Sequence, residues 1–195
     1  MDTLITDFSH LESTCLYCGQ ESAEQIRASL SRCPTDCVHL LGTGDYHYLS
    51  LFTLERLDQD FCLVLFDNHS DDQPTAFGGE LLSCGSWGLH ARRLPHLKQD
   101  IWIQNDLDLS KLSDIDYPVY LSIDLDVLSG DYARTDWDQG QMSLTTLLNG
   151  LKSIKSRILG VDICGGIAPE QNPGAEDIRV NDACYDALKE YFSAL

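Results

Sequence analysis

The feature that most constrains the fold of this chain is an apolar run, residues 61–66, which ends abruptly in side chains that can bind metal. Asp67, His69 and Asp71 stand at every second position after the run. In extended backbone alternate residues point the same way, so these three side chains can converge on one point. A continuous apolar run of this length is typical of a strand buried on both faces. The segment therefore predicts a buried strand that ends in a cation site.

A second segment repeats this design. The apolar residues 119–123 lead directly into Asp124 and Asp126. Buried carboxylates so close together would repel one another, and loss of solvent would raise their pKa values, unless cations neutralise them. With one upstream histidine, the candidate metal ligands are His47, Asp67, His69, Asp71, Asp124 and Asp126.

The rest of the chain alternates apolar strands with amphipathic helices. The expected strands are 38–41, 61–66, 101–103, 119–123 and 158–163, and the expected helices are 22–31, 48–57, 143–153 and 177–192. Pro74 and the pair Gly78–Gly79 predict a loop after the second strand. This order indicates an α/β fold with a mostly parallel sheet covered on both faces. At 195 residues we expect a single domain, 1–195. Ligands bind beyond the carboxyl ends of such strands, where the candidate ligands lie.

Composition limits the partners and the location. The net charge is −18, from 13 basic and 31 acidic residues, so neither nucleic acid nor an anionic membrane is an expected partner. The apolar runs are much shorter than a membrane span. The first residues lack the basic and apolar regions of a signal peptide, so we expect a cytoplasmic protein.

The eight cysteines are expected to be free thiols. Four of them, Cys62, Cys84, Cys164 and Cys184, lie in apolar or glycine-rich surroundings typical of small buried residues. The pairs Cys15/Cys18 and Cys33/Cys37 have spacings that zinc sites use, but the predicted helix 22–31 separates them, and their role stays open.

The donor set indicates the metal and the chemistry. Two imidazoles and four carboxylates without a thiolate suit manganese or another borderline-hard ion, and four carboxylates are neutralised by two divalent ions. Two-metal sites hold their ions roughly 3.5–4 Å apart and generate a bridging hydroxide. The expected cofactor is therefore two Mn²⁺ ions, and the expected chemistry is hydrolysis.

Three motifs resemble those of the ureohydrolases, the arginase and agmatinase superfamily. Asp67-Asn-His69-Ser-Asp71 resembles the D-A-H-x-D signature, and Ser122-Ile-Asp124-Leu-Asp126 resembles S-x-D-x-D. Gly44-Asp45-Tyr46-His47 resembles G-G-D-H with one residue inserted. The resemblance implies an arginase-like three-layer α/β/α sandwich with a binuclear manganese site. It assigns His47, Asp67, Asp71 and Asp124 to one ion, and Asp67 or His69 with Asp124 and Asp126 to the other.

Departures from the family pattern affect the substrate. The chain is shorter than is usual for the family. Gly165 stands where guanidino-hydrolysing members carry a substrate-binding Glu, so a replacement would have to come from Glu170 or Glu176. The family's proton-transfer histidine has no clear counterpart, although His90 is nearby. We therefore expect hydrolysis of a C–N bond in a small molecule, whether amidine, guanidine or amide, rather than of arginine.

Further candidates surround the expected ligands. Asp71, His69, Asp126 and His90 are the expected catalytic residues. Asp45 is expected to orient His47, because metal-bound imidazoles usually have such a partner. Substrate contact or support of the ligands is expected from Trp87, Asp136, Asp138, Asp162 and Glu170.

Two other functions stay open at this stage. One is a single-zinc, deacetylase-like hydrolase, which needs fewer ligands. The other is a non-catalytic, metal-binding descendant of the ureohydrolases, favoured by the loss of the Glu at Gly165. The sequence also leaves open whether the chain forms a homo-oligomer.

Overall fold

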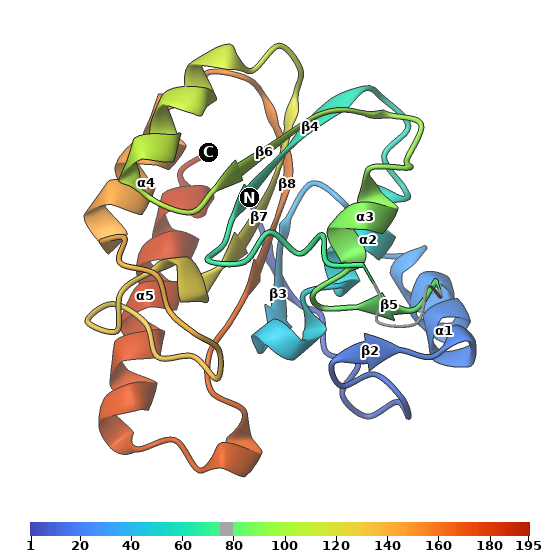
Figure 1. Cartoon of the computed structure of the whole chain (residues 1–195), viewed down its shortest axis with the longest axis horizontal. Helices are drawn as coiled ribbons and strands as arrows, with labels where there is room; N and C mark the ends of the chain where they lie inside the picture. Colours follow the sequence, from blue (N-terminus) through green and yellow to red (C-terminus); the bar gives the residue numbers. More distant parts are fainter. Residues whose placement is uncertain (75–79) are drawn as a thin grey trace.

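A six-stranded parallel sheet forms the centre of the molecule (Figure 1). The computed structural model describes residues 1–74 and 80–195, so the expected Gly78–Gly79 turn lies outside the described residues. The strands lie in the order β1-β3-β8-β7-β4-β6, and every adjacent pair is parallel. Their bounds are Thr3–Ile5 (β1), Val38–Gly42 (β3), Phe61–Phe66 (β4), Leu97–Ile103 (β6), Val119–Asp124 (β7) and Ile158–Cys164 (β8). A separate antiparallel pair joins β2 (Tyr17–Cys18) to β5 (Leu82–Ser83).

Helices cover both faces of the large sheet, which gives the three-layer α/β/α sandwich (Figure 1). One face carries α1 (Gln20–Leu30), α2 (Leu49–Leu54) and α3 (Trp87–Ala91). The other carries α4 (Leu144–Ser153) and α5 (Ala175–Ser193). Short 3₁₀ helices connect these elements: η1 (Gly44–Tyr46), η2 (Asp106–Asp114), η3 (Leu125–Val127) and η4 (Pro169–Gln171). The predicted fold class is confirmed.

Strand β4 shows why its sequence is apolar at every position. Phe61, Leu63 and Leu65 belong to the core under α1, α2 and α3. The alternate residues, Cys62, Val64 and Phe66, belong to the core under α4 and α5. Since each fully buried large side chain contributes about 1.5–3 kcal/mol, both cores depend on this strand. Its carboxyl end is consequently a fixed platform for the polar residues that follow.

The expected strands and helices are all present; the strand 61–66 has the expected bounds, and the others have shifted ends. The strand expected at 101–103 is longer, Leu97–Ile103, and lies at the edge of the sheet. The helix expected at 48–57 is only Leu49–Leu54. The patterns missed β1, the β2–β5 pair, η2 and α3. Each of these lacks a periodic apolar pattern; β1, for example, has three residues and leaves Ile5 exposed at the sheet edge.

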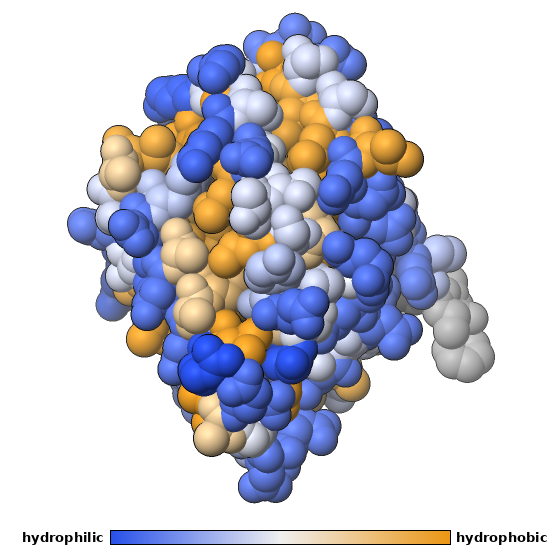
Figure 2. All heavy atoms as spheres, turned by 90° about the vertical axis from the view of Figure 1, so that its left-hand side faces the viewer, coloured by the Kyte–Doolittle hydropathy of each residue, from blue (hydrophilic) through white to orange (hydrophobic). Residues whose placement is uncertain are grey.

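Figure 2 looks onto the side of the molecule that carries α4 and α5. Hydrophilic residues surround smaller groups of hydrophobic ones on this face. In the described part of the chain, no helix combines the length and apolar character needed to cross a bilayer.

Candidate metal centre

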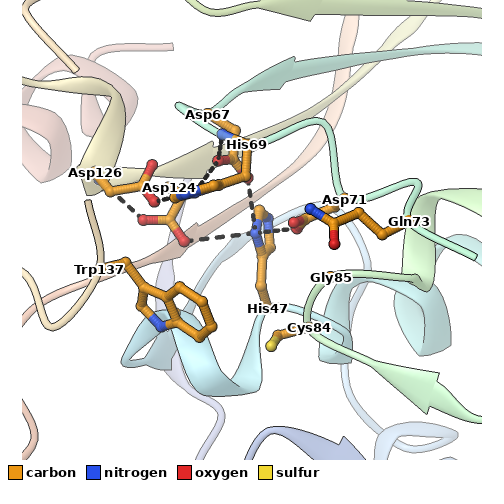
Figure 3. A pocket seen from close by; sticks show the side chains of 11 residues that line it. His47, Asp67, His69, Asp71, Gln73, Cys84, Gly85, Asp124, Asp126 and Trp137 are labelled. Atoms are coloured by element: carbon orange, nitrogen blue, oxygen red, sulfur yellow. Dashed lines mark hydrogen bonds and ion pairs between the residues drawn. The ribbon is translucent and has the colours of Figure 1, made fainter. Parts of the chain in front are cut away.

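The six candidate ligands meet beyond the carboxyl ends of β3, β7 and β4 in the central sheet. Strand β3 leads through η1 to His47, and β4 ends immediately before Asp67. Asp124 is the last residue of β7, and the others follow in the loops beyond. The six side chains line one cavity of about 130 Å³, which is also lined by Gly44, Gln73, Cys84, Gly85 and Trp137 (Figure 3).

His47 is the centre of the first donor group (Figure 3). Its Nδ1 lies 3.1 Å from Asp67 Oδ2 and 3.0 Å from Asp71 Oδ2. Asp124 Oδ2 lies 3.5 Å from the same nitrogen. All four side chains are buried. One nitrogen facing three carboxylates is the arrangement that a shared cation would need.

His69 forms the second group with two carboxylates. Its Nδ1 lies 2.8 Å from Asp126 Oδ2 and 3.6 Å from Asp67 Oδ1. Asp67 thus contributes one oxygen to each group. The side chain of His69 is 31% exposed, so it is the ligand candidate that reaches furthest into the open part of the site.

The pKa values and the buried carboxylates of the site are those expected where cations bind. Burial and the charges of neighbouring carboxylates raise the pKa of both Asp124 and Asp126. Hydrogen bonds with Asp126 and Asp67 raise the pKa of His69 to about 10. Within the described residues, the buried Asp67 Oδ2 has no hydrogen-bond partner. An orphaned carboxylate oxygen among four buried acids fits divalent cations in both groups.

Neighbouring groups fix the orientation of the ligands. Nε2 of His47 is hydrogen-bonded with Ser122 Oγ at 2.8 Å, which leaves Nδ1 facing the carboxylates. The Trp87 indole donates to Asp71 Oδ2 at 2.5 Å. The backbone of Asp71 has a φ of +47°, and the N–H of Gly88 donates to its carbonyl. The start of α3 therefore holds Asp71 by both its backbone and its side chain.

Replacement of Trp87 by Phe tests this hold on Asp71. Trp87→Phe keeps an aromatic ring in the core but removes the donor to the carboxylate. Since loss of such a partner costs roughly 10–100-fold in metal affinity, we expect that decrease in calorimetric titrations with Mn²⁺. Trp102→Phe is the matched control, because its indole donates only to the backbone carbonyl of Asp67. Equal losses in both variants would contradict a specific role for Trp87.

Several predicted positions lie elsewhere. Asp45 does not orient His47; its two oxygens accept from the indole of Trp137 at 3.0 Å and the thiol of Cys15 at 3.4 Å. The partner of His47 is Ser122 instead. His90 lies on α3 and lines a different groove, next to Arg27 and Glu55.

The remaining acidic candidates do not line the cavity. Asp162 is buried within β8, where it accepts from the hydroxyl of Tyr120 at 2.8 Å and makes no hydrogen bond to the six ligands. Asp136 accepts from the backbone of Ala168, Asp138 is exposed, and Glu170 is exposed on η4. The surface loop that contains Asp136 and Asp138 does reach the cavity, but through Trp137 between them.

Four further residues of the site were not among the expected site residues. Trp137 packs edge-to-face against His69, with ring centroids 5.8 Å apart. Gln73 and Cys84 also line the cavity. Cys164, expected only as a buried core thiol, donates to Asp124 Oδ2 at 3.1 Å. The sequence feature that could have indicated this contact is the position of Cys164 at the end of an apolar strand, which is also the position of Asp124.

The carboxylate missing at Gly165 has no replacement in the described structure. A Cβ at Gly165 would lie 2.7 Å from Asp124 Oδ1 and 2.8 Å from the Leu125 nitrogen, so the position has no room for a side chain. Glu176 is exposed and pairs with Arg179. Among the described residues, the acidic side chains that line the cavity are those of the four carboxylate ligand candidates, Asp67, Asp71, Asp124 and Asp126.

The paired cysteines form no metal site within the described residues. Cys15, Cys18, Cys33 and Cys37 are free, and none belongs to a group of donors close enough to share an ion.

The sequence and the fold of this chain are similar to those of known proteins. No protein-family model matches the chain. An uncharacterised protein of Thermotoga maritima is 39% identical over 143 residues, which cover 66% of this chain and 57% of that protein. The arginase of Medicago truncatula superposes with a TM-score of 0.63 at 17% identity, over 89% of this chain and 63% of that chain.

A further solved structure, a proclavaminate amidino hydrolase from Streptomyces clavuligerus, gives a TM-score of 0.62 at 17% identity, over 90% of this chain and 70% of that one. The chain therefore spans less than two thirds of the Thermotoga protein and of the Medicago arginase. Its three-layer sandwich is the arginase fold, and the chain shares it with the enzymes of the ureohydrolase superfamily.

Proposed function

We propose that this protein is a divergent ureohydrolase: a binuclear-metal hydrolase that cleaves a C–N bond in a small molecule. The observation that carries the proposal is Asp67, which offers one oxygen to each of two donor groups at the carboxyl ends of the central strands. A single-ion site would leave the second group, His69 with Asp126, unexplained. The structural likeness to arginases and amidino hydrolases supports the same reading.

The two groups would hold different ions. His47, Asp67, Asp71 and Asp124 would hold one. Asp67, His69 and Asp126 would hold the other, with manganese as the ion that these nitrogen and oxygen donors favour. Bound divalent cations lower the pKa of a coordinated water and polarise the group under attack. Ser122 and Trp87 keep His47 and Asp71 in place.

The residues that line the cavity limit the class of substrate that it can bind. Trp137 offers an aromatic surface beside His69, and Gln73 offers an amide. No carboxylate beyond the ligand candidates lines the described cavity to pair with a guanidinium. We therefore propose a small substrate with a planar amide or amidine group that stacks on Trp137.

Elemental analysis of the purified full chain, combined with turnover assays, tests this function. We expect two divalent ions per chain and metal-dependent release of ammonia or an amine from a panel of small amides, amidines and guanidines. A single zinc per chain would favour the deacetylase-like alternative. Two ions without turnover on the whole panel would favour a non-catalytic, metal-binding protein.

A further inference from the structure

We propose that Cys164 is a ligand of the ion held by His47 and Asp124, which makes the two metal positions chemically unequal and shifts this one from manganese towards zinc or cobalt. This inference rests on the binuclear centre proposed above. A set without a thiolate favours manganese, whereas a thiolate favours softer divalent ions. The position of Cys164 decides whether the donor set of this ion includes a thiolate.

The sheet places Cys164 beside a ligand. Asp124 and Cys164 are register partners at the ends of the adjacent parallel strands β7 and β8. The Cys164 thiol lies 3.1 Å from Asp124 Oδ2, which is the oxygen that faces His47. Two donors that are each roughly 2.0–2.3 Å from one ion lie about 3–3.5 Å apart, depending on the angle between them at the metal. The observed spacing therefore suits a shared ion.

A third donor completes this group. Atoms of His47, Asp124 and Cys164 lie within 4.8 Å of one another, as do those of His47, Asp67 and Asp71. The two sets meet at His47. The buried Asp67 Oδ2, 3.1 Å from His47 Nδ1, has no hydrogen-bond partner among the described residues, which fits an ion beside this nitrogen.

Burial determines what Cys164 can do there. The residue is fully buried and is not among the residues that line the cavity, whereas its hydrogen-bond partner Asp124 is. The thiol would thus bind the ion from the protein interior and leave the cavity to the substrate. Metal binding would release the thiol proton to solvent, as for other cysteine ligands.

X-ray absorption of the zinc-loaded full chain, prepared with reductant, tests the inference directly. We expect a zinc–sulfur shell at about 2.3 Å beside nitrogen and oxygen at about 2.0–2.2 Å. The sulfur shell should disappear in Cys164→Ser and persist in the control Cys184→Ala, which removes a buried thiol from α5. In competition titrations Cys164→Ser should also lose zinc affinity more than manganese affinity.

The outcomes separate this inference from the proposed function. Two bound ions with only nitrogen and oxygen neighbours would overturn the cysteine ligand and leave the binuclear centre standing. Loss of the sulfur shell in Cys84→Ala instead would assign the ligand to the thiol in the cavity wall. Failure to bind any divalent ion would overturn both proposals. If Cys164→Ser does not fold, Cys84→Ala decides, because a sulfur shell that persists in this variant excludes the thiol in the cavity wall.

Discussion

Asp124→Asn should abolish binding of the metal pair and reduce hydrolysis by more than the roughly 10–100-fold that loss of a partner outside the ligand set costs. Asn keeps the side-chain oxygen that accepts from the Asp126 N–H at 2.9 Å, so the turn after β7 can be preserved. It removes one negative charge from a buried cluster in which carboxylates raise one another's pKa. The variant should consequently be at least as stable as the parent chain without metal.

Two measurements separate this effect from a loss of structure. Elemental analysis reports the ions per chain, and urea unfolding in the presence of a chelator reports the free energy of unfolding. Asp138→Asn is the matched control, since Asp138 is exposed and its side chain makes no hydrogen bond or ion pair with the ligands among the described residues. Retention of two ions per chain in Asp124→Asn would refute the assignment of Asp124 as a ligand.

Gly165→Ala should damage both the stability of the fold and the metal site. The residue has a φ of +101°, a conformation that costs a residue with a side chain about 1–3 kcal/mol. In addition, its Cβ would overlap Asp124 Oδ1 and the backbone of Leu125. We expect a lower free energy of unfolding together with weaker binding of divalent ions.

Gly166→Ala is a control that separates these two causes. Gly166 also has a positive φ, +130°, but the nearest atom to its Cβ would be 3.8 Å away. It should therefore lose stability and keep its metal affinity. Equal metal affinities in the two variants would show that Asp124 tolerates a side chain at position 165. By the same reasoning, Gly165→Glu should not create a guanidinium site.

The ligands were predictable because each follows a buried strand directly in the sequence. Asp67 and Asp124 come immediately after or at the end of apolar runs, and the parallel sheet brings those ends together. The Gly165 departure was also visible in the sequence. Its physical reason was not, because the overlap with Asp124 arises between two different strands.

The partners of the ligands could not be predicted in the same way. Ser122 and Cys164 act through contacts between elements far apart in the sequence, whereas Trp87 was among the residues expected to support the ligands. Spacing within one segment does not report these contacts, which depend on register and rotamer. Asp45 illustrates the limit: it is two residues from His47, yet its oxygens face Trp137 and Cys15.

The strand order has a consequence for when the centre can assemble. Strand β8, the last to be synthesised, lies between β3 and β7 and joins two parts of the sheet that otherwise do not pair. His47 belongs to the β3 part, and the carboxylates belong to the part formed by β4 and β7. These are contacts of high sequence separation, whose closure slows folding. In a nascent chain that has not yet inserted β8, the two halves of the metal centre would lie apart. The ions would therefore bind only after the sheet is complete and would not help to start its folding.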